Sequence, residues 1–104
     1  MVSINECVAK ILREKEARII LDLLSNTEMP FTELQMSLSK KTGKTIHNQA
    51  LTRILHGLDK YGLIYQKFTR KNPRYYSYYE LSPLGKEILG FTEKIEETLP
   101  SVPE

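Results

Sequence analysis

The chain has 104 residues, 40% hydrophobic and 27% charged, so it is long enough for one apolar core and has an ordinary globular composition. No apolar run approaches the roughly 20 residues of a membrane-spanning helix, and the start lacks a signal-peptide pattern, so we expect a cytoplasmic protein with no membrane partner. The formal net charge is only +2, and the single cysteine excludes an internal disulfide and argues against a zinc site.

Residues 4–24 have the periodicity of an α-helix. Apolar side chains recur three and four residues apart, interrupted once by the charged residues 13–16, and they predict either one long helix or two abutting helices. Asn26, Thr27 and Pro30 then break the pattern, which predicts a turn.

A second helix is predicted to follow this turn. Thr32 and Gln35 have the spacing of a capping box, in which each side chain bonds a backbone N–H at the start of the helix. This helix should end near Lys40, before Gly43.

A third helix is predicted over residues 46–61, where leucine and isoleucine form an apolar stripe. Gly62 can end it in the left-handed conformation, and Leu63 can fold back onto it. Its opposite side is polar and carries Asn48, Gln49, Thr52, Arg53 and His56. Two segments rich in β-formers, residues 63–68 and 75–81, then predict a hairpin with a basic tip.

A last helix is predicted over residues 83–98, with Ser82 as its N-cap and Pro83 as its first residue. Its apolar residues have heptad-like spacing, and a second apolar stripe lies near the N-terminus, outside the expected three-helix core. We interpret these two stripes as the surfaces of a homodimer. The proposed dimer residues are Ile4, Val8, Ile11, Leu84, Ile88, Phe91 and Ile95.

Basic residues gather in the middle of the chain. Residues 37–74 hold nine Lys or Arg and a single acidic residue, whereas acids outnumber bases on both sides of this segment. Such segregation favours a face that binds a polyanion, although a basic segment can also be a merely solvated surface.

The order of elements predicts a mostly α protein with a small β-hairpin (α+β), namely a winged helix-turn-helix. We expect a single domain over residues 1–99, with its core in 15–89, terminal helices at 3–14 and 83–98, and a frayed tail at 100–104. In this fold the third helix enters the major groove of double-stranded DNA, where the polar residues named above would read bases. The basic residues of the turn before this helix and of the wing (69–75) would contact phosphates: Lys40, Lys41, Lys44, Arg70, Lys71 and Arg74.

Two sequence segments, ALTRILHGLDKYGLI at residues 50–64 and YELSPLGKEIL at residues 79–89, resemble the winged-helix repressors of the HxlR and MarR types. The resemblance covers roughly residues 15–89. It implies a dimeric transcription regulator, with the third helix as reader and the wing on the DNA backbone. HxlR-type proteins carry a Cys-Pro pair near the N-terminus, but here Val8 follows Cys7, which we interpret as a small buried hydrophobe rather than a redox sensor.

The wing tyrosines Tyr65, Tyr75, Tyr76, Tyr78 and Tyr79 could stack on unpaired bases, although strand packing is the simpler explanation. His47 and His56 are nine residues apart and would point to opposite sides of a helix, so no metal site is expected. No catalytic motif is present, and neither a cofactor nor an effector is indicated. The alternative function is a winged-helix module that binds a protein partner.

Overall fold

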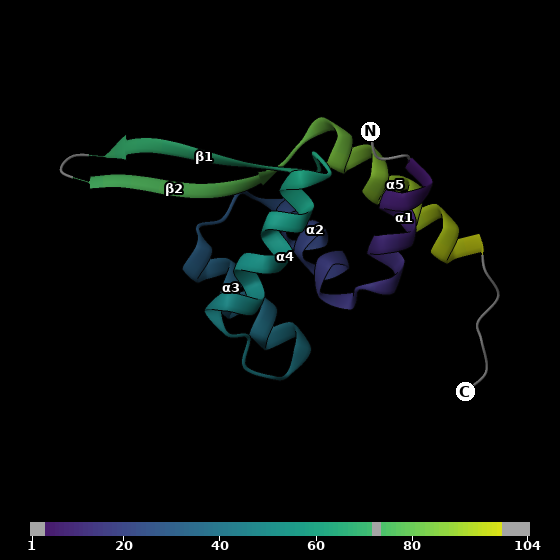
Figure 1. Cartoon of the computed structure of the whole chain (residues 1–104), viewed down its shortest axis with the longest axis horizontal. Coiled ribbons are helices and arrows are strands. Elements are labelled where there is room, and N and C mark those ends of the chain that lie inside the picture. Colours follow the sequence, from purple (N-terminus) through teal and green to yellow (C-terminus); the bar gives the residue numbers. More distant parts are fainter. Residues whose placement is uncertain (1–3, 72–73, 99–104) are drawn as a thin grey trace.

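A computed structural model of the chain describes residues 4–71 and 74–98, and it contains five helices and a two-stranded hairpin in these residues. The helices form one body from which the hairpin extends (Figure 1). The predicted mostly α architecture with a small hairpin is confirmed. The elements are α1 (Ile4–Arg13), α2 (Lys15–Asn26), α3 (Phe31–Thr42), α4 (Asn48–Lys60), β1 (Ile64–Lys71), β2 (Arg74–Leu81) and α5 (Pro83–Thr98).

The N-terminal periodicity resolves into two abutting helices. Glu14 separates α1 from α2 and has an extended backbone, with φ −102° and ψ 101°. The interruption at the charged residues 13–16 therefore marks a real break, and the direction of the chain changes there.

The start of α3 differs from the predicted capping box. Pro30 is the N-cap residue, with φ −71° and ψ 164°, and no side chain caps the helix. Thr32 therefore lies inside the first turn, and Gln35 is engaged elsewhere, as described below. The helix ends at Thr42, two residues beyond the expected Lys40 and before Gly43 as predicted. Gly43 takes the left-handed conformation (φ 73°), and its N–H donates to the Ser39 carbonyl.

The start of α4 lies two residues later than predicted. Ile46 belongs to the turn, where its side chain is buried in the core and its N–H donates to the Ser39 hydroxyl at 3.2 Å. The end of α4 is as predicted. Gly62 has φ 76°, and the Leu63 N–H donates to the Leu58 carbonyl at 3.0 Å.

One junction ties the end of α4 to the start of α5. The Ser82 hydroxyl accepts a hydrogen bond from the Gly85 N–H at 2.9 Å, which confirms the predicted N-cap, and donates to the Gly62 carbonyl at 2.6 Å. The Ser82 N–H also donates to the Leu63 carbonyl at 3.0 Å. These bonds satisfy backbone groups that the ends of two helices and the start of β1 would otherwise leave unpaired.

The two strands of the hairpin are longer than predicted. They pair antiparallel from Ile64 opposite Leu81 to Lys71 opposite Arg74, so the segment expected as a loop is largely paired backbone. Tyr79 makes two further backbone hydrogen bonds, with Met29 of the α2–α3 connection, at 2.7 and 3.0 Å. This short bridge attaches the base of the wing to the helical body.

The expectation that the two terminal apolar stripes are unpartnered is wrong for Val8, Ile11 and Ile88. These side chains are buried in the protein's own core, because α1 packs against α5. Leu84 and Phe91 remain 39% and 51% exposed, and Ile95 is half-buried. The side chain of Ile4 lies outside the described part of the chain, as do the tip residues 72–73 and the tail.

Replacing Ser82 with alanine should lower the free energy of unfolding by about 0.5–2 kcal/mol, because an N-cap acceptor is lost. The matched variant Thr32→Ala should change it little, because the start of α3 has no side-chain cap. Urea unfolding followed by circular dichroism measures both. Equal losses in the two variants would contradict this account of the helix starts.

Candidate nucleic-acid interface

The exposed side of α4 gathers the polar residues that the sequence singled out. All five are exposed and line one shallow concavity of about 390 Å³: Asn48, Gln49, Thr52, Arg53 and His56. The opposite side of α4 buries Leu51, Leu55 and Leu58 in the core. The helix is therefore held by its apolar stripe and presents amide, hydroxyl, guanidinium and imidazole groups outward.

Gln35 connects α3 to the start of α4. Its amide nitrogen donates to the Ile46 carbonyl at 2.8 Å and to the Asn48 side-chain oxygen at 2.6 Å. The Ser39 hydroxyl holds the same turn through the Ile46 N–H. These contacts fix where α4 begins relative to α3. Sequence reasoning missed this role, because the spacing of Gln35 to Thr32 suggested a cap and no local pattern indicates a bond across the turn.

The predicted phosphate-binding lysines are not equivalent. Lys40 and Lys41 are exposed on the last turn of α3, near the start of α4. The Lys44 ammonium is also exposed but lies 3.5 Å from a Glu16 carboxylate oxygen of α2. This ion pair directs Lys44 toward the helical body. The side chains of Arg70, Lys71 and Arg74 lie outside the described part of the chain.

The wing contains a cation that the sequence analysis did not single out. The Lys67 ammonium of β1 lies 2.6 Å from a Glu80 carboxylate oxygen of β2. The hydrogen bond with Glu80, and then its negative charge, raise the pKa of Lys67 above its usual value. Its charge is therefore partly neutralised by a neighbour on the same hairpin.

The base of the wing approaches the exposed side of α4. Thr52, His56 and Asp59 of α4 line a small concavity of about 120 Å³ together with Gln66 and Tyr79 of the hairpin. Burial, and then the charge of Asp59, raise the pKa of the Tyr79 phenol. The side of the wing that carries Gln66 and Tyr79 thus continues the exposed surface of α4.

The tyrosines of the wing divide between packing and exposure. Tyr79 packs against the core and Tyr78 is half-buried, whereas Tyr65 is 45% exposed. The side chains of Tyr75 and Tyr76 lie outside the described residues. For Tyr79, packing against the core is the contact that the structure provides.

In the described residues, no group of three or more His, Cys, Asp or Glu side chains is arranged to hold a metal ion. His47 and His56 are both exposed, and the Cys7 side chain lies outside the described part. Within residues 4–71 and 74–98, none of the helices has the length and apolar character needed to cross a bilayer.

Comparison with known proteins gives a similar sequence and several similar structures. An uncharacterised HTH-type transcriptional regulator of Methanocaldococcus jannaschii is 32% identical over 91 residues, which are 86% of this chain and 78% of that protein. No family profile matches the sequence.

Three solved structures illustrate the similarity of fold. The reduced form of the transcriptional regulator YodB from Bacillus subtilis has a TM-score of 0.74 at 15% identity, over 93% of this chain and 90% of that one. A transcriptional regulator from Clostridium thermocellum has a TM-score of 0.66 at 23% identity, over 93% and 87%. Bacillus subtilis PadR in complex with operator DNA has a TM-score of 0.66 at 20% identity, over 89% of this chain and 52% of PadR. The similarity of fold therefore extends to PadR and YodB. It does not confirm the expected HxlR or MarR subtype.

Proposed function

Because this chain belongs to the HTH-type transcriptional regulators, we propose that it binds double-stranded DNA in a sequence-specific manner, with α4 in the major groove. The observation that carries this proposal is the strip of five exposed polar side chains on one side of α4, described above. The major groove admits an α-helix, and each base pair presents a distinct pattern of hydrogen-bond donors and acceptors there.

The chemistry of this strip suits the edges of bases. A glutamine or asparagine amide can bond adenine at two atoms, and an arginine can bond guanine at two atoms. Gln49, Thr52 and Arg53 are exposed and line the same concavity. The bond from Gln35 restricts Asn48 to fewer orientations, so we assign Asn48 a smaller part in base reading than Gln49 or Arg53.

The basic residues before and after α4 supply affinity for DNA rather than sequence specificity. Lys40 and Lys41 precede α4 in the chain, and the wing with Arg70, Lys71 and Arg74 follows it. We expect these basic residues to contact the phosphates on the two sides of the reading helix. Lys44 would join them by giving up its ion pair with Glu16. The operator-bound state of the structural neighbour PadR is consistent with this use of the fold.

We further propose that the protein acts as a homodimer. Leu84 and Phe91 are exposed apolar side chains one heptad apart on α5, and their mutual burial between two copies would remove them from water. A symmetric dimer would place two α4 helices about 34 Å apart and read a pseudo-palindrome, and it would repress transcription by excluding polymerase. Light scattering tests the dimer, and a monomer at micromolar concentration would contradict it.

The experiment that tests DNA binding is a fluorescence-anisotropy titration with random duplex DNA at several salt concentrations. We expect the logarithm of the affinity to fall linearly with the logarithm of salt, because phosphate contacts release counterions. Arg70→Ala and Lys71→Ala should each reduce the slope by about one. Lys86→Ala, an exposed change on α5, is the matched control and should leave it unchanged.

The alternative function makes the opposite prediction. A module that binds a protein partner through the wing or α4 would show no binding to duplex DNA at low salt, or a flat salt dependence. Either result would overturn the proposed function.

A further inference from the structure

The outer side of α3 carries a short stripe of residues whose two ends have opposite charge. Helical geometry places these residues on one side, because they are three, one and three positions apart: Glu33, Met36, Ser37 and Lys40. The buried leucines of α3 lie on the opposite side. Glu33 and Lys40 are exposed, Met36 is 68% exposed, and Ser37 is half-buried. The α3 stripe therefore has a negative end, an apolar middle and a positive end.

The α3 stripe borders a concavity of about 550 Å³. All four residues of the stripe line this concavity, together with neighbours that include Thr45 and Ile46 of the turn before α4. It shares no lining residue with the concavity of α4 that we assign to base reading. The long side chain of Met36 and the hollow beside it therefore offer a knob and a hole on one surface, separate from the reading side of α4.

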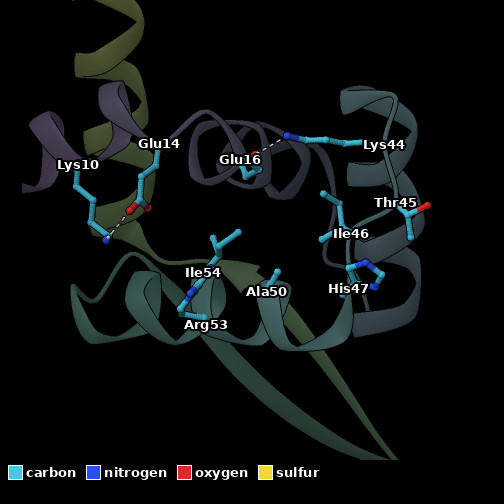
Figure 2. Close-up of a pocket in the computed structure, with 10 residues that line it drawn as sticks. All are labelled: Lys10, Glu14, Glu16, Lys44, Thr45, Ile46, His47, Ala50, Arg53 and Ile54. Atoms are coloured by element: carbon cyan, nitrogen blue, oxygen red, sulfur yellow. Dashed lines mark hydrogen bonds and ion pairs between the residues drawn. The ribbon is translucent and has the colours of Figure 1, made fainter.

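The two charged ends of the stripe are unpaired in the described part of the chain. None of the described residues forms an ion pair with Glu33 or Lys40. Seven residues of α-helix place the backbones of these two residues about 10.5 Å apart, which prevents a direct pair between them. Lys44 differs, because Figure 2 shows its side chain directed to Glu16, whereas that of Thr45 points the other way. Glu33 and Lys40 can therefore pair with another molecule.

The α3 stripe is complementary to itself. If two copies of α3 pack antiparallel about a two-fold axis between Met36 and Ser37, position 33 faces position 40 of the second copy, and position 36 faces position 37. Opposite charges then meet at both ends of the contact, and each Met36 enters the concavity beside Ser37 of the second copy. A parallel arrangement would instead place like charges opposite each other at both ends.

We propose that the α3 stripe is a contact surface for a second copy of this chain, bound antiparallel through two Glu33–Lys40 ion pairs around the two Met36 side chains. Burial removes Met36 from water, and the charges set the orientation, because exposed ion pairs give specificity more than affinity. One pair of helices is a small interface, so the contact is weak and transient in solution. Lys41 lies outside the stripe and keeps the phosphate contact proposed above.

This contact is distinct from the dimer proposed through α5. Figure 1 shows α3 and α5 on opposite sides of the helical body, so both contacts can form at once. Two symmetric contacts on opposite sides join dimers into a row. Copies bound at adjacent sites on one DNA have a raised effective concentration, at which a weak contact forms, so we expect cooperative binding. This consequence rests on the proposed function and its homodimer, but the α3 contact does not.

The contact is tested by sedimentation velocity of the full chain from micromolar to millimolar concentration. We expect the wild type to double in mass as its concentration rises, from dimer to tetramer, or from monomer to dimer if the α5 contact fails. Glu33→Lys and Lys40→Glu should each weaken this step at least about tenfold, because both ion pairs become pairs of like charge. Glu28→Lys is the matched control, since Glu28 is exposed and does not line the concavity, and it should leave the step unchanged.

A mixture of the two charge variants tests the antiparallel geometry. The Glu33→Lys copy has two positive ends and the Lys40→Glu copy has two negative ends, so both ion pairs return when the two copies meet. We expect the mixture to regain the association of the wild type, although neither variant associates alone. A wild type that does not double in mass, an unweakened charge variant, a mixture as weak as its components, or an equal loss in Glu28→Lys would each overturn the contact.

The consequence on DNA is measured separately with Met36→Ala, which changes no charge. On a random duplex long enough for several dimers, we expect cooperative binding by the wild type and less cooperative binding by the variant. The affinity for a duplex that holds one dimer should be the same for both. Equal cooperativity on the long duplex overturns the consequence and leaves the contact in place. If the protein binds no DNA at all, the proposed function fails, and sedimentation still decides whether the α3 contact forms.

Discussion

Gly85→Ala is expected to destabilise the protein by about 3 kcal/mol or more, at or beyond the upper end of what overpacking a core costs. A Cβ atom at this position would lie 2.1 Å from the Leu63 carbonyl oxygen and 2.9 Å from the Leu81 side chain. The oxygen belongs to the backbone and accepts the Ser82 N–H, so it cannot move aside without breaking the junction between α4 and α5. Urea unfolding measures the loss.

Gly90→Ala is the matched control on the same helix. A Cβ atom there meets no other atom within 4 Å, and alanine is the better helix former, so this variant should gain about 0.5–1 kcal/mol. A Gly85→Ala protein as stable as the wild type would show that the junction yields, and that its close packing is not required for the fold.

Gln49→Ala is expected to weaken binding to the protein's own operator by about 5- to 150-fold, which corresponds to the 1–3 kcal/mol of one good pair of hydrogen bonds to a base. The operator is first selected from a pool of random duplexes by the wild-type protein. Because Gln49 carries no charge, its loss should leave both the affinity for random DNA and the salt dependence unchanged. Anisotropy titrations on the two duplexes measure the difference.

Asn26→Ala is the control for Gln49→Ala. Asn26 is an exposed amide at the end of α2 that does not line the concavity of α4, and its replacement should change neither affinity. Equal weakening of binding to operator and random DNA in Gln49→Ala would mean that Gln49 contacts the DNA backbone rather than base edges. This result would contradict base reading by α4.

Features set by local sequence were predicted well. The end of α3 before Gly43, the αL conformation of Gly62, the Ser82 N-cap and the apolar stripe of α4 each depend on residues within one or two helical turns, and the structure confirms them. The gathering of five polar side chains on the outer side of α4 follows in the same way, because helical geometry alone places them together. Their role in reading bases stays a prediction.

Features set by contacts between distant segments were missed. The spacing of Gln35 to Thr32 suggested a capping box. In the folded turn the Gln35 amide instead donates to two acceptors, the Ile46 carbonyl and the Asn48 side-chain oxygen. The bridge between Met29 and Tyr79 joins segments fifty residues apart and has no signature in either. The periodicity that identified two terminal stripes could not show that they pack on each other.

A concavity of about 540 Å³ between the α1–α2 break and the first half of α4 was also beyond sequence reasoning. Its lining comes from three segments, around residues 10–16, 44–47 and 50–54, and their charges look unrelated along the chain. Only the folded arrangement shows that both lysines of the lining are paired with glutamates and that Arg53 lines two surfaces.

The junction at Ser82 has a consequence for the length of the DNA site. Its three hydrogen bonds and the close approach of Gly85 to Leu63 hold α5 at a fixed angle to α4. In a dimer built on α5, a rotation of one α5 against the other therefore moves the two α4 helices as rigid arms. Substitutions at Leu84 or Phe91 that alter this rotation would change the number of base pairs between preferred half-sites, although neither residue approaches a base.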